Sequence, residues 1–371
     1  MHRSIPLILV LLLVLILGNT PLWAQGLGEL PRFKGRVVEV SSSGPLPGFE
    51  EQWETQVVKI RLNSGPHKNQ DIVILNTLTG HPFFDLRVKK GDRVVLQGDF
   101  SGPSAEYYLA DYYRGGPLIF ISLLFVFLIM LIGGKQGLKA IVSLVVMGLV
   151  IVTMILPLIL KGFSPILVTV GLSSALTGVF ILFIGGYSKK TVAAICGTVG
   201  GLVTSGVLAY VVGKASYLTG LASEEAQMLQ FMDASINFQG LLFSGMIIGA
   251  LGAILDVGIS IASAMEQIKE ADPTTDFQTL FSRGLHVGKD LIATMSNTLI
   301  LAYVGSSLPL LLLFHTNQSS WAQVLNFDLI ASEVVRAMTG SIGLTLAIPL
   351  TAFVAALLLV DPDHEGQNLG D

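Results

Sequence analysis

The residues best suited to chemistry lie in apolar segments long enough to cross a membrane. The segment 245–266 carries one carboxylate, Asp256, among Ile, Leu, Ala, Val and Met side chains. At about 100° per residue, small and polar residues share its helical stripe, namely Gly245, Gly249, Gly252, Ser260 and Ser263. An ionisable group in a membrane span is costly unless it is partnered or hydrated. We therefore expect a central helix with Asp256 facing the interior of a bundle. The alternative is a packing helix whose Asp256 caps or hydrogen-bonds a neighbour.

Two later apolar segments also carry polar residues at helical spacing. Asp290, Thr294 and Asn297 share one face, and Glu333 aligns with Arg336 and with two glycines, Gly340 and Gly343. Carboxylates, hydroxyls and an amide that converge among helices can form an oxygen-rich path for a cation or a proton. On this hypothesis Arg336 would neutralise Asp256 or Glu333 in one state and release it in another. The alternative is that these groups hold helices together, with Glu333 and Arg336 paired at the membrane boundary.

Small residues predict where helices pack closely. Gly197, Gly201 and Ser205 form one stripe in segment 191–213, with Gly200 and Thr204 beside it. Such surfaces let helix backbones approach each other in a membrane. We therefore expect a helix-packing role for five glycines: Gly197, Gly201, Gly245, Gly249 and Gly252.

The composition indicates a protein that crosses the membrane several times. Of 371 residues, 51% are hydrophobic and only 13% are charged, and the mean hydropathy is +0.69. Soluble domains carry roughly a quarter of charged residues. The net charge of −4 does not favour nucleic-acid binding. A single cysteine, Cys196, excludes an intrachain disulfide, and we interpret it as a small buried apolar residue.

The motifs of common enzymes are absent from the sequence. It contains no HExxH, no GxSxG and no P-loop. An intramembrane aspartyl protease needs two carboxylates that share a proton. Asp256 and Asp290 are the candidates, but their depths along the predicted helices differ by roughly 10 Å. We therefore predict neither an enzyme, a cofactor nor a metal site.

The chain begins with two regions of different character. Residues 1–24 resemble a signal peptide, with an uncleaved anchor as the alternative. Residues 25–111 are polar and rich in turns, and we predict strands at 35–40, 55–62, 71–75 and 92–98. This spacing favours a small antiparallel β-domain outside the cytoplasm, of the OB type or similar. His67 and His81 are interpreted as exposed loop residues, and residues 107–114, with four tyrosines, as an interfacial anchor.

The rest of the chain predicts an α-helical polytopic membrane domain over residues 112–362 and a cytoplasmic tail over 363–371. We expect about seven spans of roughly 20 residues: 117–133, 138–160, 164–186, 191–213, 238–264, 291–314 and 335–360. Lysine and arginine are concentrated in the loops that this topology places in the cytoplasm. The longer connections 214–237 and 266–290 each predict a short surface helix, which we interpret as a connector rather than a lid.

Several stretches resemble the YibE/F-like family of bacterial multispanning membrane proteins. In the membrane region these are GALGAILDVGISIASAMEQI, DLIATMSNTLILAYVGSSLPLLLL and EVVRAMTGSIGLTLAIPLTA; in the outer domain they are LNSGPHKN, HPFFDLRVKKGD and ADYYR. The resemblance implies a protein of the bacterial plasma membrane and supplies no substrate. From the residues alone we expect a transporter or channel-like protein for a small solute or ion. The alternative is a non-transporting scaffold or sensor whose outer β-domain binds a partner, and either protein could associate with itself or with another membrane protein.

Overall fold

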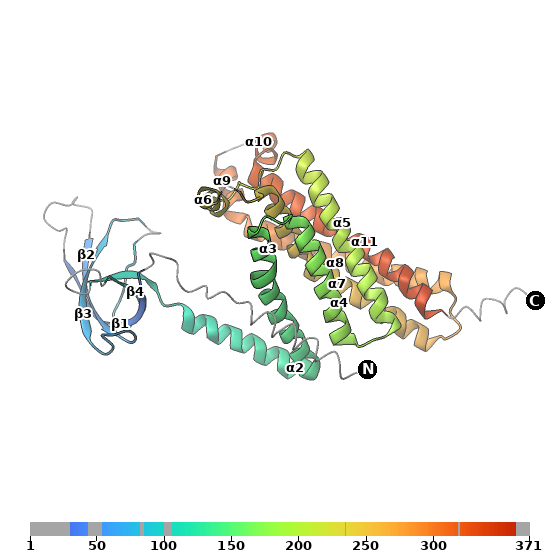
Figure 1. The fold of residues 1–371 in the computed structure, drawn as a ribbon, viewed down its shortest axis with the longest axis horizontal. Coiled ribbons are helices and arrows are strands. Elements are labelled where there is room, and N and C mark those ends of the chain that lie inside the picture. The colour runs from blue at the N-terminus through green and yellow to red at the C-terminus, as the bar shows by residue number, and fades with distance from the viewer. Residues whose placement is uncertain are drawn as a thin grey trace, which may run out of the picture. The chain divides into compact units, whose positions relative to one another are not determined.

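A computed structural model of the chain describes residues 30–43, 54–81, 85–99, 106–233, 235–317 and 320–360. The predicted signal peptide and the predicted C-terminal tail lie outside these residues. The chain divides at Gly134 into two compact units, which are described separately. Figure 1 shows a curved sheet in one unit and a set of packed helices in the other.

The first unit is built on one antiparallel sheet. Its strands are β1 (Arg32–Ser43), β2 (Glu54–Leu62), β3 (Asp71–Leu78), β4 (Arg93–Asp99) and β5 (Glu106–Tyr112). They pair in the order β3-β2-β1-β4-β5, so that β3 and β5 form the two edges. One face buries a compact apolar core, which comprises Val37, Val58, Ile60, Leu62, Ile74, Val88, Val94 and Leu96. The expectation of a small antiparallel β-domain is therefore confirmed, as a half-barrel.

Most of the tyrosine-rich stretch forms strand β5, which the sequence did not predict, and its role as an interfacial anchor stays a prediction. β5 forms an antiparallel ladder with β4, from Val94 opposite Tyr112 to Asp99 opposite Glu106. Tyr107 and Tyr112 pack against the apolar core of the sheet. His67 also differs from its interpretation as an exposed loop residue, because it is partly buried and its Nδ1 lies 2.6 Å from Tyr107 Oη.

The remaining elements are helices. In chain order they are α2 (Gly115–Val150), a π-turn (Ile151–Ile155), α3 (Leu156–Leu160), α4 (Pro165–Gly185), α5 (Lys189–Ala215), α6 (Glu224–Met232), α7 (Phe238–Ala271), α8 (Phe277–Ser306), α9 (Leu308–Thr316), α10 (Trp321–Leu325) and α11 (Asp328–Leu359). Pro165, Pro309 and the N-cap Ser188 mark helix starts, as expected for proline in a first turn and a serine cap.

Five of these helical segments are long and apolar enough to cross a membrane, or six if α8 and α9 form one bent span. The first is a run of 46 residues, Gly115–Leu160, which contains both the predicted spans 117–133 and 138–160. At 1.5 Å per residue it would be about 69 Å long, roughly twice the hydrocarbon thickness. Gly134 interrupts it with φ 51° and ψ −127°. The count of seven spans depends on this break and stays a prediction.

The two long connections differ in outcome. Residues 214–237 contain the short helix α6, as predicted. The second connection is almost entirely helical, because α7 continues to Ala271 and α8 begins at Phe277. The predicted separate amphipathic helix is therefore the first part of α8. Its stripe of Phe277, Leu280, Phe281 and Leu285 belongs to the main apolar core.

That core is formed where α5, α7, α8 and α11 meet. The crossing of α5 and α11 is especially close. A Cβ on Gly201 would lie 2.7 Å from the Gly343 carbonyl oxygen, and a Cβ on Gly343 would lie 2.8 Å from the Gly201 oxygen. Both positions admit only a hydrogen, so the two backbones pack directly against each other.

Candidate functional site

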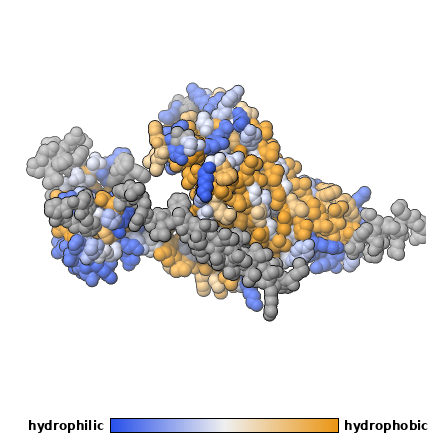
Figure 2. Space-filling view, viewed as in Figure 1, coloured by the Kyte–Doolittle hydropathy of each residue, from blue (hydrophilic) through white to orange (hydrophobic). Residues whose placement is uncertain are grey.

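The outer faces of α5 and α11 are apolar. On α11 the exposed large side chains are Val334, Met338, Ile342, Leu346, Leu350, Phe353 and Leu357; on α5 they are Val203, Val207, Tyr210, Val211 and Val212. Figure 2 shows the face on which α4, α5 and α11 lie, where hydrophobic residues predominate between more hydrophilic ends. These surfaces have the composition expected of helices that face lipid.

The outer face of α7 has a different composition. No large hydrophobic side chain is exposed on this fully described helix. Its exposed residues are Gly249, Gly252, Asp256, Ser260, Gln267, Glu270 and Ala271. The apolar residues of α7 point into the core instead, among them Ile254, Val257 and Ile261. The exposed face of α7 is therefore small and polar over the depth at which neighbouring helices are apolar.

Asp256 occupies the middle of this face and is exposed. Its carboxylate makes no hydrogen bond or ion pair within the described part of the chain. One turn away, a Cβ built on Gly252 would meet nothing within 4 Å. The expectation that Asp256 faces the interior of the bundle was therefore wrong: within this chain it points outward.

The polar face continues onto α8. Asp290, Thr294 and Asn297 are all exposed. The two helices run antiparallel, because Gly249 of α7 lies beside Tyr303 and Ile261 lies beside Gly288. Interpolation along the helices places Asp256 roughly level with Thr294 and Asn297. We refer to Gly252, Asp256, Ser260, Asp290, Thr294 and Asn297 as the α7–α8 polar face. Ser263, the other predicted member, is half-buried at its edge.

Glu333 and Arg336 lie elsewhere. Arg336 Nε is 3.3 Å from Glu333 Oε2 within α11, and both side chains are 23% exposed. Arg336 is close to Gly245, since a Cβ there would lie 3.7 Å from its Nη1. Gly245 is eleven residues from Asp256, or about 16 Å along the helix. Arg336 is therefore paired with Glu333, and the structure does not bring it to Asp256.

Tyr303 of α8 lies beside Gly249 of α7 and was not predicted as a site residue from the sequence. Its Oη would lie 2.8 Å from a Cβ on Gly249. The hydroxyl is buried and has no hydrogen-bond partner in the described structure. A lone tyrosine within an apolar segment was the available signal, but interfacial tyrosines give the same signal.

The predicted packing glycines fall into two groups. Gly197 is in direct contact with Thr351, and Gly201 packs on Gly343, so both lie where α5 crosses α11. Gly245 and Gly249 instead leave room for Arg336 and Tyr303. A Cβ on Gly252 would meet no atom of another helix within 4 Å in the described structure. Cys196 also differs from its interpretation, because it is exposed on α5 rather than buried.

Charged residues beyond the polar face serve to hold helix ends. Lys190 at the start of α5 forms an ion pair with Glu266 near the end of α7. Lys269 donates hydrogen bonds to the Pro273 and Thr275 carbonyl oxygens and so closes the turn before α8. Within the described ranges, no group of three or more His, Cys, Asp or Glu side chains could hold a metal ion.

These features define a multi-pass α-helical membrane protein with a small β-domain at its N-terminal end. The YibE/F-like protein family matches residues 121–361, and the YibE/F family N-terminal domain matches residues 35–112. The chain belongs to the YibE/F-like family, as the resemblance in the sequence implies. Comparison with curated proteins and with solved structures found no match.

Proposed function

We propose that this protein moves a small cation or protons across the bacterial plasma membrane along the α7–α8 polar face. The observation that carries the proposal is the position of Asp256, which is exposed at the middle of a helix with no large exposed hydrophobic side chain. A carboxylate facing lipid costs at least about 2.5 kcal/mol by insertion scales. Hydration of this face would remove that cost.

The chemistry of the face fits a hard cation or a proton. Asp256 supplies an anionic oxygen, and Ser260, Thr294 and Asn297 supply neutral oxygens. Oxygen ligands of this kind suit cations that keep part of their hydration shell. No lysine or arginine belongs to the α7–α8 polar face. The face would therefore attract cations and repel anions.

The proposed orientation places the β-domain outside and the C-terminus in the cytoplasm. It is supported by the signal-like residues 1–24 and by lysines such as Lys189, Lys190 and Lys269 on the proposed cytoplasmic side. Under this orientation the Glu333–Arg336 pair and Tyr303 lie toward the outer end of the bundle. Asp256 then lies between them and the cytoplasmic ion pair of Lys190 with Glu266.

The alternative function is a scaffold or sensor without transport. In that case a helix of another membrane protein, or of a second copy, covers the α7–α8 polar face and hydrogen-bonds Asp256. In either function the Asp256 carboxylate gains hydrogen-bond partners, from water in the first and from a helix in the second. They differ in whether water and ions reach it.

Flux into liposomes distinguishes the two functions. The purified chain is reconstituted into liposomes that contain a dye selective for the ion under test, and gradients of protons, Na⁺, K⁺ and Mg²⁺ are applied in turn. We expect flux of at least one of these ions and a loss of about tenfold or more in Asp256→Asn, a change of about 1.4 kcal/mol in barrier. Glu224→Gln, in α6, is the matched control and should keep the flux. Absence of flux for all four ions, or full flux in Asp256→Asn, would favour the scaffold.

A further inference from the structure

The β-domain has a groove that runs along the open edges of its sheet. β3 and β5 stand at the two ends of the strand order, and each has one unpaired side. Every neighbouring pair is antiparallel, so β3 and β5 run in the same direction. Between them lies a groove of about 690 Å³, which is lined by His67, Gln70, residues 72–75 of β3 and residues 106–108 of β5.

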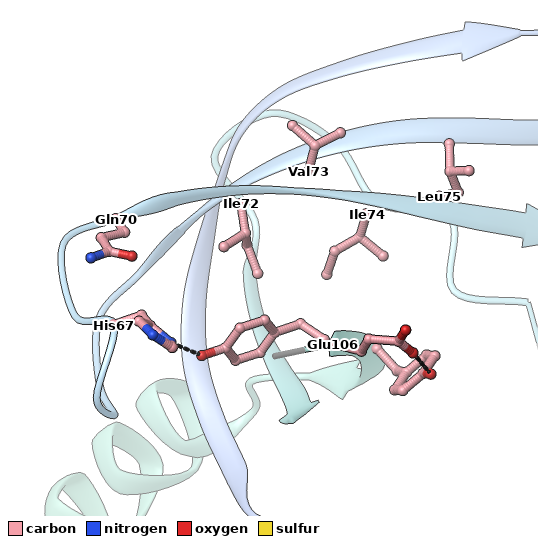
Figure 3. Close-up of a pocket in the computed structure, with 9 residues that line it drawn as sticks. His67, Gln70, Ile72, Val73, Ile74, Leu75 and Glu106 are labelled. Atoms are coloured by element: carbon pink, nitrogen blue, oxygen red, sulfur yellow. Dashed lines mark hydrogen bonds between the residues drawn. The ribbon is translucent and has the colours of Figure 1, made fainter. Parts of the chain in front are cut away.

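The groove carries the exposed apolar surface of this domain. Among the described residues of the sheet region, the large hydrophobic side chains that are exposed are Val73 (64%), Leu75 (60%) and Tyr108 (48%). Figure 3 shows Val73 and Leu75 leaving β3 on the side opposite to Ile72 and Ile74. Single exposed apolar residues are ordinary, but three that line one groove, two on β3 and one on β5, indicate a contact surface.

The backbone of β3 offers hydrogen bonds at the same positions. Leu62 N donates to the Gln70 carbonyl oxygen at 3.0 Å, which fixes the phase of the ladder between β2 and β3. Antiparallel ladders alternate between residues that face the partner strand and residues that face away. Val73 and Leu75 therefore direct their N–H and C=O groups toward the open edge. Free edges of this kind are templates for pairing with another extended chain.

We propose that an extended segment of another protein binds in this groove by adding a strand to the edge of β3. Backbone pairing with β3 would provide affinity, and apolar side chains at alternate positions of the segment would pack on Val73, Leu75 and Tyr108. The lining contains Glu106 and no lysine or arginine, so a basic residue at one end of the segment is favoured. The groove belongs to the β-domain, so this inference is independent of the proposed ion path.

A second copy of the chain fits the groove less well. The groove has β3 on one side and β5 on the other. An edge strand of a second copy brings its own neighbouring strand with it, because β3 is paired to β2 and β5 to β4. A single extended segment has no such neighbour. The shape of the groove therefore selects an isolated strand.

Peptide binding to the full-length protein in lipid nanodiscs tests the proposal. The probe is a fluorescein-labelled peptide, Lys-Thr-Val-Thr-Val-Thr-Val-Lys, followed by fluorescence anisotropy. One control peptide has proline at its two central positions, which removes backbone donors. A second has glutamate in place of both lysines. We expect saturable binding of the first peptide and affinities at least about tenfold lower for both controls.

Protein variants locate the binding surface. Val73→Lys and Leu75→Lys place a charge on an exposed edge, as natural edge strands often do, and should fold normally. Each should weaken binding by about tenfold or more, whereas Ser42→Lys, an exposed position on β1 outside the groove, should change it less than about twofold. Thermal melting of each variant reports folding.

Three results would overturn the proposal. The first is absence of binding by the alternating peptide up to about 1 mM. The second is equal binding by Leu75→Lys and the wild type. The third is self-association of the wild type that excludes the peptide and is abolished by Leu75→Lys, which would make a second copy the occupant.

Discussion

Replacing Gly201 with valine should destabilise the helical unit through the crossing of α5 and α11. A Cβ at this position would lie 2.7 Å from the Gly343 carbonyl oxygen, 2.8 Å from Ala347 Cβ and 2.9 Å from Ile254 Cγ2. Carbon atoms in relaxed contact are about 3.5–4.0 Å apart. Two of the three neighbours are backbone or a Cβ, which a rotamer change cannot move. The helices must therefore separate.

The expected cost follows from this overlap. Overpacking of a close-packed core costs about 1–3 kcal/mol for small additions, and valine adds two γ-carbons beyond the Cβ. Glycine and valine differ by only a few tenths of a kcal/mol in helix propensity, so propensity offsets little of the loss. We expect Gly201→Val to lower the free energy of unfolding by about 2–3 kcal/mol.

Unfolding in mixed micelles at increasing fractions of sodium dodecyl sulfate measures this loss. Gly171→Val in α4 is the matched control, because a Cβ there would meet nothing within 4 Å. Gly252→Val in α7 is a second control, with the same open surroundings. Both should stay within about 0.5 kcal/mol of the wild type. Equal stability of Gly201→Val and Gly171→Val would refute the close crossing.

Three further predictions concern single side chains. Asp256→Asn should change the free energy of unfolding in micelles by less than about 0.5 kcal/mol, because the carboxylate has no partner in the described chain; a large loss would show that it holds a neighbouring helix. Lys190→Ala, Glu266→Gln and the double variant should give a coupling energy of about 0.5–1 kcal/mol for their half-buried ion pair, and zero coupling would contradict the contact. Hydrogen bonds from Thr79 and Gly80 lower the pKa of Asp85. The ionised Asp85 carboxylate therefore contributes to stability above a pH of about 4, and this contribution is lost as the pH falls through the lowered pKa. Thermal melting between pH 6 and pH 2 should therefore depend less on pH in Asp85→Asn, and an unchanged dependence would exclude this role.

The sequence predicted the β-domain and the apolar helices because both leave a regular pattern. Alternation in residues 55–62 reappears as the alternating burial of β2. β5 lacks that alternation, since its sequence EYYLADY mixes tyrosines with acidic residues. Tyrosine favours both strands and membrane interfaces, and the local sequence alone does not separate the two.

The direction in which a helix face points was harder to predict. Helical spacing correctly grouped Gly252, Asp256 and Ser260 on one stripe of α7. It could not tell whether that stripe faces the bundle or its outside, because lipid and protein interior are about equally apolar. The same ambiguity affected Cys196. Only the packing of α7 on α5 and α11 decides the matter, and that depends on contacts distant in the sequence.

Reactivity of introduced cysteines with a charged, membrane-impermeant methanethiosulfonate tests most directly whether the α7–α8 polar face is hydrated. The chain has one native cysteine, so Cys196→Ser gives a clean background. Thiolates form and react only where water reaches them. In liposomes we predict that Ser260→Cys and Thr294→Cys react at least about tenfold faster than the controls Val203→Cys on α5 and Leu346→Cys on α11, which lie on apolar outer faces. Rates at Ser260→Cys and Thr294→Cys equal to those of the two controls would contradict a hydrated path.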